Sequence, residues 1–430
     1  MGLRQSYGGV GREDCTESVA VESNSHNLRN YLLITGSYWA FTLTDGAIRM
    51  LVVLYFHLLG YSPFEVAMLF LFYEFFGIVT NLVGGWLGTR IGLNRIMHIG
   101  MGLQVLALLM LTVPEAWLSV AYVMVAQALS GIAKDLNKMS AKAGVKTLVP
   151  QDSGTHSDSR LFKWVAMLTG SKNALKGVGF FLGALLLEFV GFRNALLILA
   201  GSLLLVLLLT AIMLPQGLGK TKSKPTFTQI FSNTSAINGL SAARFFLFGA
   251  RDVWFVVGLP VFLFSVLGWR FSEVGAFLAL WVIVYGIVQS CAPMILRGHH
   301  PDGKTARWWV FALMLIPASI ALALQQGLEP NRVIIIGLFV FGAVFAINSA
   351  VHSYLIVAWS GYDKVSMNVG FYYMANAGGR LTGTVLSGWI YQTQGLVGCL
   401  WWSAAFVLVA GLLSLRLPAG MKKTHDRVGT

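Results

Sequence analysis

The chain has 430 residues, of which 56% are hydrophobic and only 11% are charged, well below the roughly 25% charge of soluble domains. Its net charge of +13 lies largely in short loops between apolar stretches, which excludes a nucleic-acid-binding domain and indicates a protein of the lipid bilayer. The stretches reach the ~20 residues that cross a bilayer, and they are continuous rather than alternating. We therefore expect an all-α polytopic membrane protein.

The chain is predicted to divide into two bundles with polar ends. Residues 1–29 are polar and lack the apolar core of a signal peptide, so we expect a disordered tail. The Gly-, Lys- and Pro-containing segment 215–235 reads as a linker between six-helix bundles at 30–214 and 236–417, and 418–430 as a second tail. The twelve spans are expected to start near Asn30, Phe64, Ile96, Leu118, Leu161, Asn194, Ala236, Phe271, Ala306, Arg332, Met367 and Leu396.

Cations gather in alternate loops, for example at Lys142 and Lys146 and in the linker, while the intervening loops carry few. This asymmetry is the positive-inside signal, and it predicts that both termini are cytoplasmic.

The two halves repeat each other. LGYSPFEV at residues 59–66 recurs as LGWRFSEV at 267–274, between the first two spans of each half. In the fifth spans, Lys176, Gly179, Gly183 and Gly191 correspond at one constant offset to Arg380, Gly383, Ser387 and Gly395. The loop GWLGTRIGLNR at 85–95 resembles the loop motif of major facilitator transporters, with Thr89 in place of its acidic residue. Together these features predict a major facilitator fold, twelve transmembrane helices in two pseudo-symmetric halves, with a site between the halves.

Charged residues inside apolar spans point to the site. An ionised group near the bilayer centre costs roughly 2.5–3.5 kcal/mol on insertion scales, so such groups face a bundle interior or a polar path. Most of those in this chain are cations, and a basic interior is suited to an anion. The candidate substrate-binding cations are Arg49, Lys134, Lys138, Lys176, Arg244, Arg251 and Arg380.

Among these cations, Arg49 and Arg251 are the first choice, because arginine presents a planar fork that binds an oxyanion through two hydrogen bonds. Arg244 lies two helical turns before Arg251 on the same face. Lys176 and Arg380 are expected to hold the other end of an elongated anion, with structural ion pairing as the alternative.

Lys134, Lys138, Lys142 and Lys146 recur every fourth residue on one helical face, with Asp135 beside them. We expect the first two to line a substrate path and the last two to reach the cytoplasmic surface.

Three acidic residues are candidates for coupling to an ion: Asp45, Glu74 and Asp252. Asp45 and Arg49 lie one turn apart and are spaced for an intrahelical ion pair, which leaves a structural and a functional interpretation open.

Uncharged polar residues within spans complete the candidates: Asn348, His352, Tyr373 and Asn376. Each is a possible ligand for substrate, although hydrogen bonding between helices is the commoner use of such residues.

Cys15, Cys291 and Cys399 lie far apart and form no metal-ligand pattern, and no catalytic or ATP-binding motif occurs. We therefore expect neither an enzyme nor a cofactor, and transport energy drawn from gradients.

Three further strings are more specific: YWAFTLTDGAIRML at residues 38–51, FYEFFGIVTN at 72–81 and GIAKDLNKMSAK at 131–142. They resemble the ArsJ family of organoarsenical efflux permeases from bacterial arsenic-resistance operons, and the similarity extends from about Asn30 to Leu415. The resemblance implies export of 1-arseno-3-phosphoglycerate across the bacterial inner membrane, with a glyceraldehyde-3-phosphate dehydrogenase as functional partner. The alternatives are an organophosphate or other organic-anion carrier of the same superfamily, and a non-transporting membrane sensor.

Overall fold

The computed structural model describes residues 13–91, 93–148, 155–214, 234–296, 301–359 and 365–419, and the side chains of parts of these ranges. Within them the chain is helical apart from short turns. The helices of the first half are α1 (Glu13–Leu58), α2 (Pro63–Met68), α3 (Leu71–Ile91), α4 (Leu93–Met110), α5 (Val120–Leu148), α6 (Thr155–Val190) and α7 (Phe192–Met213), with a 3-10 turn at Glu115–Trp117. Those of the second half are α8 (Ser235–Phe255), α9 (Gly258–Ser265), α10 (Phe271–Ile295), α11 (Gly303–Gln325), α12 (Pro330–Ala358) and α13 (Val365–Ser414).

These helices make twelve helical segments in the described part of the chain. α2 and α3 together cover one apolar span, α8 and α9 cover another, and α13 divides at Gly395, where φ is 65°. Among the described residues, nine stretches are long and apolar enough to cross a membrane, counting Gly370–Ser414 as one. α4 falls short of that length, and α5 carries Lys134, Asp135 and Lys138. The predicted all-α architecture is confirmed.

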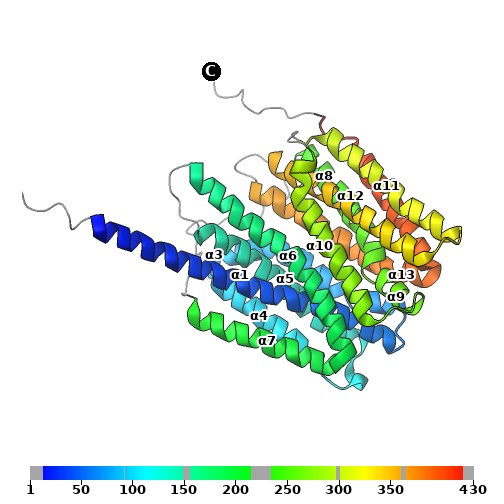
Figure 1. Ribbon diagram of the computed structural model, residues 1–430, viewed down its shortest axis with the longest axis horizontal. Coiled ribbons are helices and arrows are strands. Elements are labelled where there is room, and N and C mark those ends of the chain that lie inside the picture. The colour runs from blue at the N-terminus through cyan, green and yellow to red at the C-terminus, as the bar shows by residue number, and fades with distance from the viewer. Residues whose placement is uncertain are drawn as a thin grey trace, which may run out of the picture.

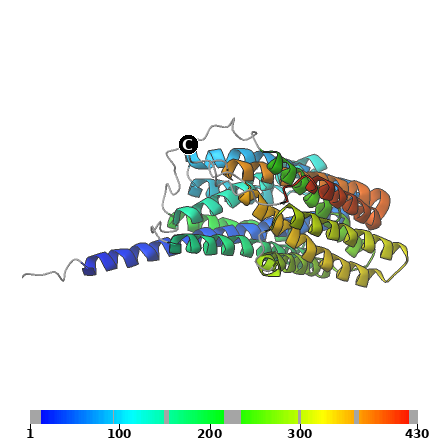
Figure 2. The same cartoon turned by 90° about the horizontal axis from the view of Figure 1, so that it is seen from above.

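The N-terminal boundary differs from the prediction. α1 begins at Glu13, so residues 13–29 continue the first span as a helix that projects beyond its neighbours (Figures 1 and 2). Adding turns to an existing helix is far easier than nucleating one, and Glu13, Glu17, Ala20 and Glu22 are residue types with high helix propensity. Residues 1–12, 215–233 of the predicted linker and 420–430 of the second tail lie outside the described residues.

Figure 1 shows the helices of the first half, blue to green, gathered beside those of the second half, green to red. The repeat found in the sequence has matching geometry in the two halves. Ser62 and Arg270 both precede a helix as N-cap residues, and in each half the backbone N–H of this residue donates to the glutamate three positions on, Glu65 or Glu273. In the first half the Ser62 hydroxyl also accepts from the N–H of Glu65, which completes a capping box there. These hydrogen bonds satisfy backbone N–H groups that would otherwise lack partners at the helix starts.

Tight turns gather at one end of the bundle, which we call the turn end. Gly60, Gly191, Gly268, Gly327 and Gly395 lie there, one in each of five connections, and all have positive φ. Glycine adopts this backbone conformation without the steric cost of a side chain. The glycines of the two aligned pairs, Gly60 with Gly268 and Gly191 with Gly395, therefore perform the same task in each half.

Two equivalent hydrogen bonds join the halves at the turn end, and we call them the two latches. Glu188 of α6 accepts a hydrogen bond from the backbone N–H of Ser272 at 2.9 Å, and Gln392 of α13 accepts one from the N–H of Phe64 at 3.2 Å. Both acceptors meet the first turn of a helix, where N–H groups have no partner within the helix. The latches therefore tie α6 to α10 and α13 to α2.

Between the latches, His57 at the end of α1 contacts Ser265 at the end of α9, with 2.6 Å between Nε2 and Oγ. Small residues bring the helix pairs of the latches close together. Gly275 of α10 packs on Ala184 of α6, and Gly388 of α13 packs on Ala67 of α2. The halves are thus closed against each other at the turn end.

We expect the double variant Glu188→Ala and Gln392→Ala to open the turn end, because it removes both acceptors. The measurement is disulfide cross-linking of His57→Cys with Ser265→Cys in a background without Cys15, Cys291 and Cys399. The yield should fall at least about threefold, the effect expected from losing about 0.7 kcal/mol of hydrogen bonding. Glu115→Ala is the control, since Glu115 bonds Tyr55 within the same half. An unchanged yield in the double variant would contradict the role of the latches.

Candidate substrate-binding site

Two adjoining cavities lie between the halves. The larger holds about 340 Å³, within the range of about 300–1,000 Å³ typical of small-molecule sites, and the smaller holds about 60 Å³. Their linings come from α1, α3, α5 and α6 of the first half and from α8, α10, α12 and α13 of the second. Both cavities are bordered by Tyr38, Lys138, Lys172, Lys176, Tyr373, Asn376 and Arg380.

The linings carry an excess of positive charge. Eight cationic residues stand against four acidic ones, Asp45, Glu74, Asp135 and Asp252, which leaves a formal excess of four positive charges among the described lining residues. The cations are Arg49, Lys134, Lys138, Lys172, Lys176, Arg244, Arg251 and Arg380. A low-dielectric interior strengthens the field of such charges, so the cavities attract anions.

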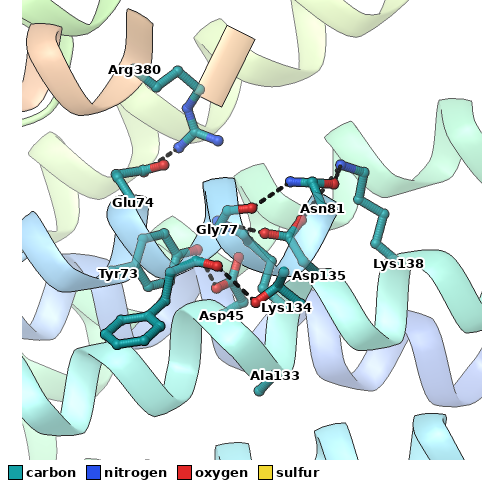
Figure 3. Close-up of polar contacts among 12 residues, drawn as sticks. Asp45, Tyr73, Glu74, Gly77, Asn81, Ala133, Lys134, Asp135, Lys138 and Arg380 are labelled. Atoms are coloured by element: carbon teal, nitrogen blue, oxygen red, sulfur yellow. Dashed lines mark hydrogen bonds and ion pairs between the residues drawn. The ribbon is translucent and has the colours of Figure 1, made fainter. Parts of the chain in front are cut away.

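Five of the charged groups form a continuous ion-paired chain, which we call the central ion chain. Arg49 and Arg380 both donate to Oε1 of Glu74, at 2.9 and 2.6 Å. Asp252 accepts from Arg380 at 3.1 Å and from Arg251 at 2.5 Å. The link between Glu74 and Arg380, drawn in Figure 3, joins α3 of the first half to α13 of the second.

Glycines on α13 explain how Asp252 and Arg380 come so close. A side chain at Gly379 would collide with the backbone of Phe245, and one at Gly383 would collide with Gly249 and Asp252. α8 and α13 therefore approach each other almost backbone to backbone, as small residues allow in membranes. This contact places Asp252 within reach of Arg380.

The intrahelical pair that the spacing of Asp45 and Arg49 would allow is not formed in the structure. Asp45 instead accepts a hydrogen bond from the Tyr73 hydroxyl at 2.6 Å, and Arg49 pairs with Glu74. The guanidinium carbon of Arg49 also lies 5.2 and 4.9 Å from the ring centroids of Phe70 and Tyr73. α3 offers Arg49 a carboxylate and the ring of Tyr73, and Phe70 just before α3 adds a second aromatic face. This set of partners suits a guanidinium better than one carboxylate on its own helix.

The lysines of α5 surround Asp135, as Figure 3 shows. Lys134 and Lys138 lie 3.8 and 3.5 Å from its oxygens, and Lys138 also donates to Asn81 at 3.3 Å. The ammonium of Lys134 lies 3.9 Å from the ring centroid of Tyr73. One carboxylate between two ammonium groups leaves a net positive charge on the wall of the smaller cavity. The side chains of Lys142 and Lys146 lie outside the described residues.

Arg244 and Lys176 differ from the other cations, because neither has a carboxylate partner among the described residues. Arg244 is 4% exposed, donates to Asn376 at 3.1 Å and to the carbonyl of Ser349 at 3.3 Å, and lies 3.9 Å from the centroid of Phe248. The contact described for Lys176 is with the Phe180 ring, at 5.7 Å. A buried cation without an ion-paired carboxylate is costly, so these positions favour an anion.

The remaining polar candidates separate into two groups. Tyr373 and Asn376 border both cavities, and the Lys138 ammonium lies 4.9 Å from the Tyr373 ring. Asn348 and His352 are fully buried and border neither, and within the described residues no hydrogen-bond partner is found for them. The structure therefore does not place Asn348 and His352 at the site.

Other lining residues were absent from the sequence-based set of candidates. Helical spacing could have predicted two of them, because they share a helical face with candidate residues. Tyr38 lies two turns before Asp45, and Lys172 lies one turn before Lys176. Tyr285, Gln289 and Ser349 border the larger cavity from α10 and α12, and no motif marks them. Their hydroxyl and amide groups add hydrogen-bonding capacity opposite the cations.

The fold and this central site define a membrane carrier built from two six-helix halves. The sequence model of the Major Facilitator Superfamily matches residues 34–351, and the chain belongs to this superfamily of secondary transporters. No curated protein matches the chain.

Solved structures agree in fold. A nucleoside transporter, NupG, is 13% identical with a TM-score of 0.69, and the match covers 91% of this chain and 99% of that one. A D-xylose–proton symporter is 14% identical with a TM-score of 0.65, covering 92% and 97%. A bacterial homologue of the human drug peptide transporters PepT1 and PepT2 is 16% identical with a TM-score of 0.64, covering 91% and 97%.

We expect Asp252→Asn to destabilise the substrate-free protein far more than Arg244→Gln. The first change leaves Arg251 and Arg380 without their shared carboxylate, a loss of about 3–5 kcal/mol for a broken buried pair. The second removes a buried cation that has no counter-ion, so its two lost hydrogen bonds, worth about 1 kcal/mol each, are partly offset. Thermal unfolding of the two purified variants, compared with the wild-type protein, measures the difference. Equal losses, or a larger loss for Arg244→Gln, would contradict the described charge balance.

Proposed function

We propose that this protein exports a multiply charged organic oxyanion, namely 1-arseno-3-phosphoglycerate, and thereby confers resistance to arsenate. The observation that carries the proposal is the excess of four positive charges lining the cavities between the halves. A substrate with several negative charges would balance them, whereas a neutral or singly charged solute would leave most of the excess uncompensated.

An anion with two oxyanion ends suits the distribution of these groups. Lys134, Lys138 and Lys176 approach the cavities from the first half, and Arg244 and Arg251 from the second. Arginine binds a tetrahedral oxyanion through two parallel hydrogen bonds, while lysine supplies a mobile point charge. An arsenate ester at one end and a phosphate ester at the other would draw on both halves at once.

The strings that resemble the organoarsenical efflux permeases support this choice of substrate, because each of them borders the site. The first includes Asp45 and Arg49 of α1, the second Glu74 and Asn81 of α3, and the third Lys134, Asp135 and Lys138 of α5. The resemblance therefore concerns the residues that would meet substrate. The resemblance also implies a functional partner, a glyceraldehyde-3-phosphate dehydrogenase that forms the ester.

The ligand chemistry favours pentavalent over trivalent arsenic. Arsenite prefers soft thiolates, and Cys291 and Cys399 border neither cavity. An arsenate ester instead presents oxygen atoms, which hydrogen-bond to guanidinium and ammonium groups as phosphate does.

Direction follows from the proposed placement in the bacterial inner membrane with cytoplasmic termini. An inside-negative potential of 100 mV favours outward movement of one negative charge by about 2.3 kcal/mol. The larger cavity is bordered by Lys138, Gln289 and Ser353, which lie toward the end of the bundle opposite the closed turn end. In that orientation the cavity lies toward the cytoplasm, from which the ester would enter.

An organophosphate carrier is the second candidate, because the same cations would bind a phosphorylated organic acid. A cavity lined by cations from both halves favours either carrier over a non-transporting sensor.

The deciding experiment uses everted membrane vesicles that contain the protein and are supplied with arsenate, glyceraldehyde 3-phosphate, NAD and the dehydrogenase. We expect arsenic to accumulate inside, and the accumulation to vanish when either the dehydrogenase or glyceraldehyde 3-phosphate is omitted. Accumulation from arsenate alone would indicate a simple oxyanion exporter. Its absence under every condition, together with uptake of radiolabelled 3-phosphoglycerate, would favour the organophosphate carrier.

In the same vesicles we expect Arg251→Gln and Arg49→Gln to reduce the rate at least about 100-fold, because each loses a charge-assisted contact in a buried site. Arg332→Gln is the matched control, since Arg332 is 84% exposed in a surface ion pair and should leave the rate unchanged. Lys142→Gln should have a smaller effect than Arg251→Gln. Full transport by both site variants, with insertion confirmed, would refute the assigned site.

A further inference from the structure

We propose that Glu74 and Asp252 act as built-in counter-anions that let the substrate-free carrier return to the conformation open to the cytoplasm. The protein would then perform net export rather than obligatory exchange. The inference rests on the proposed function as an anion exporter and adds its mode of operation.

The geometry of the central ion chain pairs the buried arginines with carboxylates. Both Arg49 and Arg380 donate to one oxygen of Glu74, and the Glu74 side chain is only 1% exposed. Asp252 pairs with Arg251 through one carboxylate oxygen and with Arg380 through the other, and its side chain is also 1% exposed. In the described structure, the three arginines at the centre of the carrier are therefore paired with protein carboxylates.

The position of Arg380 exposes it to an entering substrate. Arg380 borders both cavities, so an entering oxyanion meets the same guanidinium that Glu74 and Asp252 hold. A carboxylate and a phosphate- or arsenate-type oxyanion use the same donors of an arginine fork, and they compete for them. When substrate takes Arg380, Glu74 remains beside Lys134 on the wall of the smaller cavity. The carboxylate is displaced without losing every cation nearby.

The contrast with Arg244 and Lys176 gives the two groups of cations different tasks. These two have no carboxylate partner in the described part of the chain, so they are the ready attractors of an anion. The paired arginines exchange one partner for another. A site with cations of both kinds can capture an anion while its three central arginines stay paired with carboxylates when it is empty.

The consequence concerns the return step. A carrier must pass through a state closed at both ends, and a buried cation without a counter-ion raises the free energy of that state. With Glu74 and Asp252 in place, the central ion chain has three positive and two negative groups. Without Glu74 it has two uncompensated charges, and the empty carrier would need a new anion before it could return.

The test compares Glu74→Gln with the wild-type protein in everted vesicles, using the dehydrogenase system to supply the arsenoester. Vesicles are either empty or preloaded with 3-phosphoglycerate as a counter-anion. We expect wild-type accumulation of arsenic to differ less than about twofold between the two arms. In Glu74→Gln we expect accumulation in empty vesicles to fall about 100-fold, as loss of a buried partner predicts, and to recover to within about threefold of wild type with counter-anion. Glu329→Gln, which removes an exposed carboxylate paired with Arg332, should behave as wild type.

Asp252→Asn provides a second variant with the same expected pattern, and it carries the test if Glu74→Gln does not reach the membrane. The inference is overturned if wild type itself requires the counter-anion. It is also overturned if an inserted, monodisperse variant loses transport equally in both arms, or in neither.

These outcomes can be distinguished from a failure of the proposal that the substrate is the arsenoester. If wild type accumulates no arsenic but takes up radiolabelled 3-phosphoglycerate, the arsenoester proposal fails. The same two arms are then run with 3-phosphoglycerate on both sides. The role of Glu74 and Asp252 would still be supported, or overturned, by the dependence of each variant on the counter-anion.

Discussion

The surplus of cations buried between the two halves is the constraint on which the rest of the structure depends. Charged groups inside a bilayer are costly unless they are paired, hydrogen-bonded or hydrated. The protein meets this constraint for most of them through the central ion chain, through Asp135 between two lysines, and through aromatic faces such as Phe248 beneath Arg244. What is left over, at Arg244 and Lys176, is the part of the interior that an anionic substrate would complete.

The internal repeat supplies a common scaffold on which the two halves have acquired different chemistry. Lys176 and Arg380 occupy equivalent positions, yet the lysine has no carboxylate partner among the described residues and the arginine has two. Glu188 and Gln392 are equivalent as well, and both accept a backbone hydrogen bond from the opposite half. Packing and capping are thus shared, because both halves must close in the same way. The charges differ between the halves, which suits the proposed substrate with two different ends.

Much of this arrangement follows from the sequence. Hydropathy predicts the helices, because it depends on the local pattern of apolar residues. The repeat predicts equivalent turns, because these depend on residues such as Gly60 and Gly268. The set of interior cations is also predictable, since a charge in an apolar span has few places to go.

The pairing of those charges is not predictable from the sequence. Spacing along α1 favours a pair of Asp45 with Arg49, whereas the folded protein joins Arg49 to Glu74 and Asp45 to Tyr73. Partners from different helices are set by how closely the helices pack, and Gly379 and Gly383 determine this only once α8 is beside them. Lining residues such as Gln289, which carry no charge and no motif, are likewise visible only in the fold.

The central claim is that the interior requires a multiply charged anion, and binding to the purified protein tests it most directly. Calorimetry would compare 3-phosphoglycerate with glycerate and glycerol, which share the carbon skeleton but carry progressively less negative charge. The account predicts binding of 3-phosphoglycerate at least about tenfold tighter than glycerate, no binding of glycerol, and weakening as ionic strength rises. Equal affinity for the three, or tighter binding of the uncharged solute, would contradict it.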